Sequence, residues 1–301
     1  MTLPNFLIIG AAKSGTSSLY MYLKQHPQIY LSPIKEPHFF SYDSKSKMTS
    51  GPGDFIPNAI TDFEEYIHLF DGVKDEIAIG EASPTYLYRE EAPIRIHALI
   101  PSVKIICILR DPAERAFSAY KHLVREHRET AKDFQEALAL EEDRISKNCG
   151  PLWHFVNVGL YYQQLKRYYD LFDPKNILVI LQEDLLKDPT TVFSRIFDFL
   201  RVDPEFLPDS SKKYNISGLP KNKRVHKIAG KIFNSPNPIR WLSRKIIPRQ
   251  TRKKFKRSVI QNNMEQSEIP ENIREELLNA FKEDIQNLEQ LINQDLSNWL
   301  N

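Results

Sequence analysis

Short apolar runs alternate along this chain with segments whose apolar residues recur every three or four positions. Runs that would be apolar on both faces are typical of strands buried in a parallel sheet. Four of them lie at residues 6–10, 77–81, 103–110 and 177–184. Helical periodicity predicts helices at residues 16–25, 92–100, 112–129, 133–146, 161–172 and 190–200. The alternation predicts an α/β fold of three layers, with helices covering both faces of a central parallel sheet.

The other segments predict features around one body. The length of 301 residues fits one large domain or two small ones, and we predict a single domain over residues 1–301. Residues 41–58 are rich in Ser, Gly, Pro and Lys, which predicts a long surface loop, either a lid or a passive connection. Residues 270–300 predict a C-terminal helix that docks on the body, with one apolar face made of Ile273, Leu277, Phe281, Ile285, Leu288 and Ile292.

Residues 147–159 form an irregular stretch that contains the aromatic sequence Trp153, His154 and Phe155. Such aromatic residues could line a pocket for an acceptor substrate. Packing over the core is the favoured interpretation.

Positive charge is concentrated in one part of the chain. The formal net charge is only +2, which does not suggest a nucleic-acid partner, but residues 212–257 contain sixteen Lys or Arg and no Asp or Glu. Within this basic segment, residues 227–257 also carry Ile, Phe, Trp241 and Leu242. They could contact an anionic membrane or an anionic acceptor. A solvated basic face is the favoured interpretation.

Cysteine use and hydropathy predict the compartment. Cys107 and Cys149 make neither a disulfide framework nor a metal-ligand spacing, which favours a reducing compartment. No run reaches the roughly 20 apolar residues needed to cross a bilayer, and no basic stretch precedes the first apolar run. We therefore expect a cytoplasmic protein, peripheral to a membrane if the basic segment binds lipid.

The first predicted strand leads into a loop with the glycine spacing of a phosphate-binding P-loop. Gly10 and Gly15 have that spacing, but Thr16 stands where such loops carry lysine, and the lysine is at position 13. Backbone N–H groups at the start of the next helix would attract an anion. Hydroxyl groups could add donors, and they belong to Ser14, Thr16, Ser17 and Ser18. The alternative is a capped strand–helix turn with an exposed lysine.

The neighbouring strands do not supply a convincing metal ligand. The run at 77–81 ends in Glu81, and the run at 103–110 reaches Arg110 before Asp111. A site that collects cations suits an anionic nucleotide bound without a metal ion, and we predict no metal site. Asp111 and Pro112 are typical of the cap and first position of a helix.

These motifs resemble those of the sulfotransferases that use 3′-phosphoadenosine-5′-phosphosulfate (PAPS), especially the heparan sulfate type and its bacterial relatives. The resemblance covers nearly the whole chain and rests on AAKSGTSSL (11–19), KEPHFF (35–40), GEASPTYLY (80–88), LRDPAERAFSAY (109–120), QEDLLKDP (182–189) and YNISGLPKN (214–222). It implies a P-loop-like fold and transfer of a sulfuryl group to a hydroxyl, or an amine, of an acceptor. Carbohydrate acceptors rank first, then glycolipids or other small alcohols, and 3′-phosphoadenosine-5′-phosphate (PAP) is the other product.

The resemblance also implies how the co-substrate is held. The first loop would contact the 5′-phosphosulfate through Lys13, Gly15, Thr16 and Ser17, with Lys13 nearest the bridging oxygen. Arg110 and Ser118 match the arginine and serine that bind the 3′-phosphate. Four residues of a basic, glycine-containing loop are further candidates on the 3′-phosphate side: Ser217, Gly218, Lys221 and Lys223.

The catalytic base is expected in KEPHFF. Glu36 matches the catalytic glutamate of the heparan-type enzymes, and it would remove the proton from the acceptor hydroxyl. His38 is the rival base, or it orients Glu36; an ion pair of Glu36 with Lys35 is the structural alternative. Ala82 stands where heparan-type relatives often carry lysine, which puts the detail of leaving-group stabilisation in question. The role of Glu81 stays open.

Two other functions compete with this one. A nucleotide-binding module without catalysis is disfavoured by the presence of Lys13, Glu36, Arg110 and Ser118. A P-loop kinase is disfavoured by Thr16 and by the lack of a metal-binding aspartate.

Overall fold

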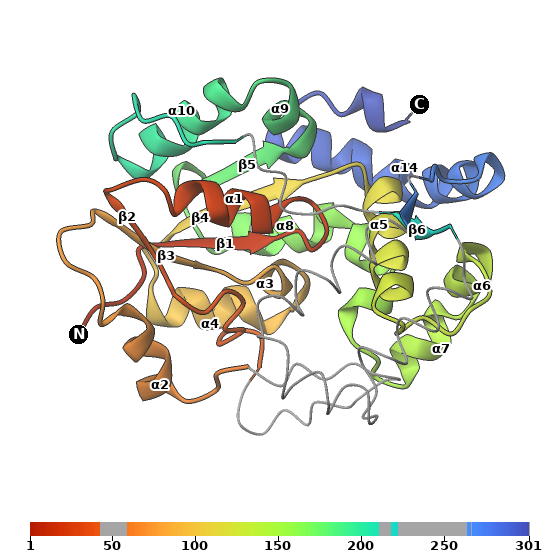
Figure 1. Ribbon diagram of the computed structural model, residues 1–301, viewed down its shortest axis with the longest axis horizontal. Helices are drawn as coiled ribbons and strands as arrows, with labels where there is room; N and C mark the ends of the chain where they lie inside the picture. Colours follow the sequence, from red (N-terminus) through yellow and green to blue (C-terminus); the bar gives the residue numbers. More distant parts are fainter. Residues whose placement is uncertain (43–58, 211–217, 222–263, 266, 301) are drawn as a thin grey trace, which may run out of the picture.

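A five-stranded parallel sheet forms the centre of the molecule. The structure is a computed structural model and describes residues 1–42, 59–210, 218–221, 264–265 and 267–300. The strand order is β2-β3-β1-β4-β5, and each neighbouring pair is parallel (Figure 1). The strands are β1 (Phe6–Gly10), β2 (Ile29–Leu31), β3 (Ala78–Ala82), β4 (Lys104–Leu109) and β5 (Ile177–Leu181). The predicted parallel sheet is confirmed.

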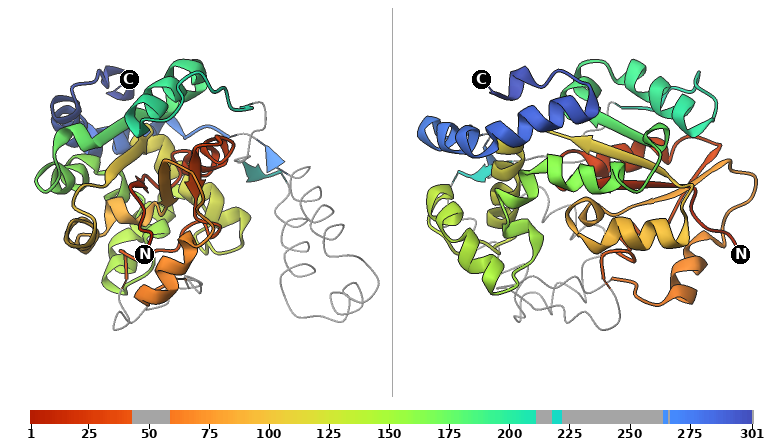
Figure 2. Two further views of the ribbon diagram at one scale, coloured as in Figure 1. Left: turned by 90° about the vertical axis from the view of Figure 1, so that its left-hand side faces the viewer. Right: turned by 180° about the vertical axis from the view of Figure 1, so that it is seen from behind.

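Alternate residues of each strand point into two separate apolar layers. In β1, Leu7 and Ile9 belong to one layer, while Phe6 and Ile8 belong to the other. The first layer is covered by α3 (Thr85–Tyr88), α4 (Glu91–Leu99), α5 (Pro112–Arg125), α8 (Tyr161–Tyr169) and α14 (Glu271–Ile292). The second is covered by α1 (Thr16–Leu23), α9 (Gln182–Lys187) and α10 (Pro189–Leu200). The fold therefore has the predicted three layers (Figure 2).

Short elements connect and flank these layers. They are the helices α2 (Phe63–Ile67), α6 (Phe134–Ala139) and α7 (Glu141–Ser146) and the 3-10 turns η1 (His68–Phe70), η2 (Pro151–Trp153), η3 (Asn157–Gly159), η4 (Pro174–Asn176) and η5 (Ser297–Leu300). The strands β6 (Leu219–Pro220) and β7 (Met264–Glu265) form a separate antiparallel pair.

Several boundaries differ from those expected. The helix predicted at 133–146 is two helices, α6 and α7, which meet at Leu140. The strand predicted at 177–184 ends at Leu181, where α9 begins. The C-terminal helix ends at Ile292, because Asn293 adopts a left-handed conformation with φ of 50°.

Local predictions about caps and packing are confirmed. The Asp111 carboxylate accepts hydrogen bonds from the N–H groups of Ala113 (2.8 Å) and Glu114 (3.1 Å) at the start of α5. Trp153 and Phe155 are fully buried in the core, as the favoured interpretation of the aromatic stretch required. The six apolar residues expected on the inner face of the C-terminal helix are all buried in α14.

Two predicted segments lie largely outside the described residues. Of the expected surface loop at 41–58, Ser41 and Tyr42 belong to the described part, and both are buried, so the loop was predicted to begin too early. The Ser41 hydroxyl bonds to Thr85 and the Tyr42 ring lies under Arg89, which explains their burial. Of the basic segment at 212–257, only residues 218–221 are described.

Candidate active site

The candidate residues come from loops that follow β1, β2 and β4. Because these strands belong to one parallel sheet, their carboxyl ends open onto one edge of that sheet. The chain leaves β1 for α1 on one face of the sheet, and it leaves β4 for α5 on the other face. Ligands of open α/β sheets bind where consecutive connections diverge in this way.

The loop between β1 and α1 has the backbone of an anion site. Gly15 precedes the helix with φ of 103°, a conformation that glycine adopts without steric cost. A side chain there would also meet Gln182, because a Cβ atom would lie 3.0 Å from its Nε2 atom. Within α1 the first turn has no acidic residue, and no side chain caps it. Its N–H groups therefore give this end of the helix partial positive charge.

The hydroxyl groups of this loop differ in their exposure. Ser14 is fully buried, and Thr16 is 4% exposed. Ser17 and Ser18 are partly exposed. Buried hydroxyl groups cannot reach a ligand without a rearrangement, so the backbone N–H groups and Ser17 are better placed to contact an anion.

Lys13 lies among several other cations. The pKa of its ammonium group is lowered to about 8, chiefly by burial and next by the charges of Arg125, Arg110 and Arg115, while Glu36 opposes the shift. Charges shift one another's pKa in this way only when they are near in space. The structure thus brings Lys13 and Arg110, which lie almost a hundred residues apart in the chain, into one electropositive region with Glu36.

Arg110 directly follows β4, and Ser118 lies two turns into α5. The Arg110 guanidinium donates to the Glu114 carboxylate at 2.8 Å and is 25% exposed. Its carbonyl oxygen accepts a hydrogen bond from the Tyr161 hydroxyl at 3.0 Å. Ser118 is 6% exposed. Arg115, one turn into the same helix, is fully buried and donates to the Phe155 carbonyl, so it supports the core.

Glu36 lies at the opening of the site. Its N–H donates to the Ala82 carbonyl at 3.0 Å, which ties it to the end of β3. Its side chain is 41% exposed and pairs with Lys35, so the ion pair considered as a structural alternative is present. The charge of the same carboxylate raises the pKa of Lys13. One of its oxygen atoms lies 3.8 Å from His38 Nε2. The pair with Lys35 does not remove Glu36 from the site.

His38 is a buried, hydrogen-bonded imidazole. Its Nδ1 atom lies 2.8 Å from the Thr85 hydroxyl, and its N–H donates to the Ser83 hydroxyl at 3.1 Å. Burial lowers the pKa of His38 to about 4, although Glu36 acts in the opposite direction. The ring is therefore neutral near pH 7, with its Nε2 atom directed at Glu36.

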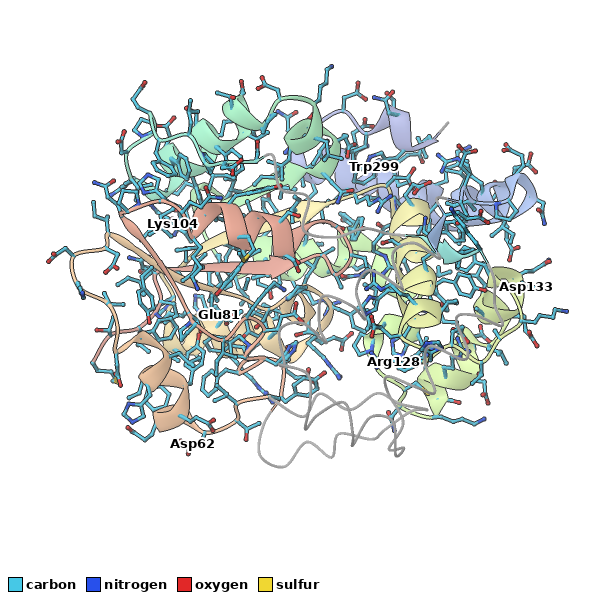
Figure 3. The ribbon with its side chains drawn as sticks, in the orientation of Figure 1. Asp62, Glu81, Lys104, Arg128, Asp133 and Trp299 are labelled. Carbon is cyan, nitrogen blue, oxygen red and sulfur yellow. The ribbon has the colours of Figure 1, made fainter. Side chains whose placement is uncertain are left out.

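Glu81 is a fully buried carboxylate in the interior, below β1 in the view of Figure 3. It accepts hydrogen bonds from the hydroxyl groups of Tyr86 (2.5 Å), Ser83 (2.8 Å) and Tyr66 (3.5 Å). Burial raises the pKa of Glu81 to about 7, although these hydrogen bonds oppose the shift. The role left open by the sequence is thus a structural one. Glu81 holds Ser83, and Ser83 holds the backbone of His38.

Sequence reasoning missed two residues of α5. His122 Nδ1 lies 2.7 Å from an Arg125 guanidinium nitrogen. Burial lowers the pKa of His122 to about 3, and the charges of Lys13 and Arg125 contribute. Residues 118, 122 and 125 recur at helical spacing, so this periodicity could have extended the site along the face that carries Ser118.

The candidates on the basic loop are only partly described. Gly218 is buried, and Lys221 is exposed next to β6. Ser217 and Lys223 lie outside the described residues. The proposed contacts of all four with a 3′-phosphate stay predictions.

Across the described ranges no group of three or more His, Cys, Asp or Glu side chains could hold a metal ion. In the part of the chain that is described, no helix is both long and apolar enough to cross a membrane.

Comparison with known proteins identifies the family. The model of the sulfotransferase domain matches residues 3–289, so the chain belongs to the sulfotransferase family, and its fold is the P-loop-like α/β fold. A sulfotransferase structure from Alicyclobacillus acidocaldarius is 39% identical, covers 100% of both chains and superposes with a TM-score of 0.79.

Curated relatives include proteins named as heparan sulfate and carbohydrate sulfotransferases. Human bifunctional heparan sulfate N-deacetylase/N-sulfotransferase 3 is 34% identical over 221 residues, which are 68% of this chain and 23% of that protein. Human carbohydrate sulfotransferase 15 is 29% identical over 255 residues, 67% of this chain and 44% of that protein. The chain thus matches less than half the length of these relatives. A mouse sulfotransferase complexed with PAP shares the fold, with 14% identity, a TM-score of 0.51 and coverage of 96% of this chain and 87% of the other.

Proposed function

We propose that this protein transfers the sulfuryl group of PAPS to a hydroxyl group, or an amine, of a carbohydrate acceptor. The observation that carries the proposal is that Lys13, Arg110 and Glu36 lie in loops at one edge of the sheet, and the effect of the charges of Arg110 and Glu36 on the pKa of Lys13 supports it. PAPS has phosphate groups at both ends of its ribose. A phosphate-binding loop and a separate guanidinium, both beside one carboxylate, suit those two ends and a proton transfer.

The reaction follows from these roles. The acceptor oxygen attacks sulfur in line while the bond between sulfur and the 5′-phosphate oxygen breaks. Glu36 takes the proton of the attacking hydroxyl, and the departing electron pair stays on the phosphate oxygen of PAP. Negative charge grows on that oxygen, so the Lys13 ammonium stabilises the transition state more than the ground state.

Glu36 is the better candidate for the base. Its carboxylate is partly exposed and acts on Lys13, so it can face the sulfuryl group from the acceptor side. His38 is buried, its Nδ1 atom is taken by Thr85, and its Nε2 atom faces Glu36. In this proposal His38 orients the carboxylate. Loss of the Lys35 pair on acceptor binding would free Glu36 to accept the proton.

The site also offers a substitute for the lysine that Ala82 replaces. Arg125 is the neighbour whose charge affects Lys13 most, and it reaches the region from α5. The charges of Lys13 and Arg125 could therefore both stabilise the negative charge that grows on the departing 5′-phosphate.

The carbohydrate acceptor is supported by the relatives, whose names specify heparan sulfate and carbohydrate. Glycolipids and small alcohols are the next candidates. Peripheral membrane contact through residues 227–257 stays a prediction, since those residues lie outside the described part of the chain.

Calorimetry tests the nucleotide. We expect tight binding of PAP that does not change when EDTA replaces Mg²⁺, and no binding of ATP. Transfer of labelled sulfuryl groups from PAPS to a panel of oligosaccharides then tests catalysis. Magnesium-dependent ATP binding would instead indicate a phosphotransferase. PAP binding without transfer to any acceptor would indicate a nucleotide-binding module without catalysis.

A further inference from the structure

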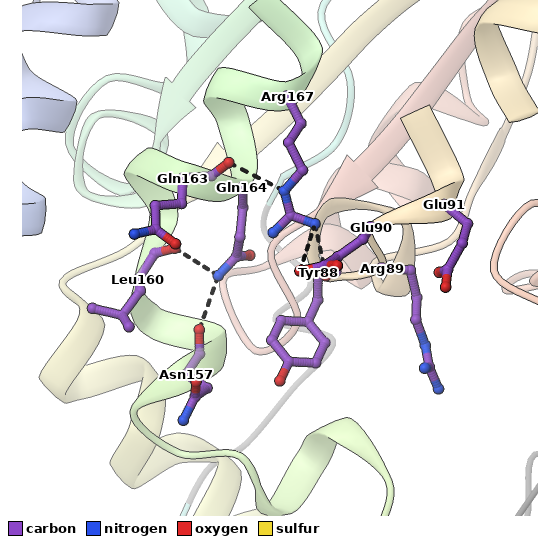
Figure 4. Close-up of a pocket in the computed structure, with 9 residues that line it drawn as sticks. All are labelled: Tyr88, Arg89, Glu90, Glu91, Asn157, Leu160, Gln163, Gln164 and Arg167. Carbon is purple, nitrogen blue, oxygen red and sulfur yellow. Dashed lines mark hydrogen bonds and ion pairs between the residues drawn. The ribbon is translucent and has the colours of Figure 1, made fainter. Parts of the chain in front are cut away.

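A polar cavity of about 310 Å³ lies between the end of α3 and α8 (Figure 4). Its walls carry two guanidinium groups, two carboxylates and three side-chain amides, together with Tyr88 and Leu160. We call it the α3–α8 cavity. None of its lining residues was a candidate in the sequence.

Two atoms of the cavity wall are buried without a hydrogen-bond partner among the described residues. Gln164 is 2% exposed, and its Nε2 atom donates to the carbonyl oxygens of Asn157 (3.0 Å) and Leu160 (2.7 Å). Its Oε1 atom has no partner in that set, and neither has Arg89 Nε. Leaving a buried donor or acceptor unpaired is costly. Both atoms are closed to solvent in this conformation, so a polar ligand would reach them only after side chains of the cavity wall shift.

Arg89 connects the cavity to the candidate base. Its guanidinium lies 4.8 Å from the centroid of the Tyr42 ring and donates to the Tyr42 hydroxyl at 3.3 Å. The Tyr42 ring in turn meets the His38 ring edge-on, with centroids 6.1 Å apart. The positive charge of Arg89 also contributes to the lowered pKa of His38. One aromatic side chain therefore separates the cavity wall from the residue that faces Glu36.

We propose that the α3–α8 cavity is an acceptor subsite, which binds a sugar ring next to the one that receives the sulfuryl group. The inference rests on the proposed function. Sugar hydroxyls both donate and accept hydrogen bonds, and the cavity offers both kinds of partner. Two cations and two anions balance, which suits a neutral ring better than an anionic one. The volume is at the lower end of the roughly 300–1,000 Å³ of small-molecule pockets, so it suits one ring.

Arg167 allows a test with little risk to folding. It is partly exposed on α8, where its guanidinium approaches the Tyr88 carbonyl at 3.5 Å and the Glu90 carboxylate at 4.0 Å. Arg167→Ala removes one guanidinium from the cavity wall. Arg195→Ala is the matched control, because Arg195 is exposed on α10 and covers the other face of the sheet. Gln164→Met adds a second variant of similar volume, which lacks the unpaired acceptor.

The probe is a neutral tetrasaccharide of N-acetylglucosamine, titrated into the 301-residue protein saturated with PAP and followed by ligand-observed NMR. We expect its Kd to rise about tenfold in Arg167→Ala and at least as much in Gln164→Met, as loss of a charged or buried hydrogen bond implies. Arg195→Ala should match the wild type. PAP titrations of each variant check that it is folded.

Two results would overturn the subsite while the sulfotransferase function stands. One is unchanged tetrasaccharide binding in Arg167→Ala, and the other is no binding to a wild-type protein that still binds PAP. Failure of the wild type to bind PAP would overturn the proposed function, and the subsite with it.

Discussion

Three residues of the candidate site share an uncommon backbone conformation. Lys13, Glu36 and His38 have φ of 73°, 64° and 59°, in the left-handed region that residues with a side chain rarely adopt. Each such conformation costs on the order of 1–3 kcal/mol and persists only where the surroundings enforce it. For Glu36 and His38 the surroundings are the Ala82 carbonyl and the Ser83 hydroxyl. His127, Asn148, Arg201 and Asn293 share this backbone region elsewhere in the fold. What supports a functional origin is that Lys13, Glu36 and His38 all belong to the candidate site.

The lowered pKa of Lys13 predicts how nucleotide binding depends on pH. The ammonium is present below pH 8 and is lost as the pH rises through about 8. We expect the Kd for PAP, measured by calorimetry, to be constant between pH 7 and 7.5 and to rise up to tenfold per pH unit above pH 8. Lys13→Met should bind PAP weakly without this rise. Lys13→Arg keeps its charge and should delay the rise beyond pH 10; an unchanged profile in Lys13→Met would refute the contact.

The two rival bases can be separated by substitution. Glu36→Gln keeps the shape of the side chain but cannot take a proton, so kcat should fall roughly 10²–10⁴-fold. The Kd for PAP should stay within about twofold. His38→Asn should reduce kcat less, since it removes only the neighbour that orients Glu36. A variant Glu36→Gln with near-normal kcat, beside an inactive His38→Asn, would assign the base to His38.

At the scale of elements, the sequence predicted what local patterns determine. β1 and β4 are continuous apolar runs, so their limits are nearly correct. α5 begins at Pro112 as predicted, after the capping aspartate, but it ends at Arg125 and not at residue 129. β2 has only three residues, too few to show a period, and was missed. The break between α6 and α7 at Leu140 was missed because helical periodicity continues through it.

The candidate site, like the fold, was predictable from the sequence only where local patterns determine it. Motif residues that follow a strand, such as Lys13 and Arg110, could be found from the chain alone. The cluster of His122 and Arg125 beside Lys13 depends on how α5 packs against the first loop, which spacing within one helix does not specify. The burial of Glu81 likewise depends on Tyr66 and Tyr86, which reach it from α2 and α3.

Glu81 joins β3, α2 and α3, and its raised pKa predicts how this junction responds to pH. The ordinary value is 4.5, and the value in the folded protein is about 7. As the pH rises from 4.5 to 7, the unfolded chain loses its proton first, so this group lowers the free energy of unfolding over that window. The shift corresponds to on the order of 3 kcal/mol.

Glu81→Gln removes this contribution, because its amide does not titrate. Urea unfolding at pH 5 and pH 8 should show that the variant gains stability relative to the wild type as the pH rises, by about 2–3 kcal/mol. Glu76→Gln, at an exposed position outside the junction, is the control. A difference between variant and wild type that does not change with pH would contradict the assignment.

At the scale of the whole molecule, the proposed nucleotide connects parts that the sheet keeps separate. The first loop leads to α1, which covers one apolar layer, while Arg110 leads to α5, which covers the other. A ligand held at both ends therefore stabilises the contact between the two connections. Such a ligand raises the free energy of unfolding of the whole domain by mass action.

This coupling gives a prediction that isolates the 3′-phosphate. PAP at 100 times its Kd should stabilise the wild type by about 2.7 kcal/mol. Arg110→Ala should reduce this to about 1.4 kcal/mol or less at the same PAP concentration, since losing a charged hydrogen bond weakens binding roughly tenfold or more. Without ligand the variant should unfold almost like the wild type, because the partly exposed pair with Glu114 contributes at most about 1 kcal/mol.

Adenosine 5′-phosphate, which lacks the 3′-phosphate, is the matched ligand, and it should stabilise both proteins equally. Arg195→Ala is the matched protein, and it should respond to PAP like the wild type. Equal stabilisation of Arg110→Ala and wild type by PAP would show that the guanidinium does not bind the 3′-phosphate. The other informative outcome is that Arg110→Ala loses the same amount of stabilisation with PAP as with adenosine 5′-phosphate. Because the 3′-phosphate is present only in PAP, that result would place Arg110 at the 5′ end of the ligand.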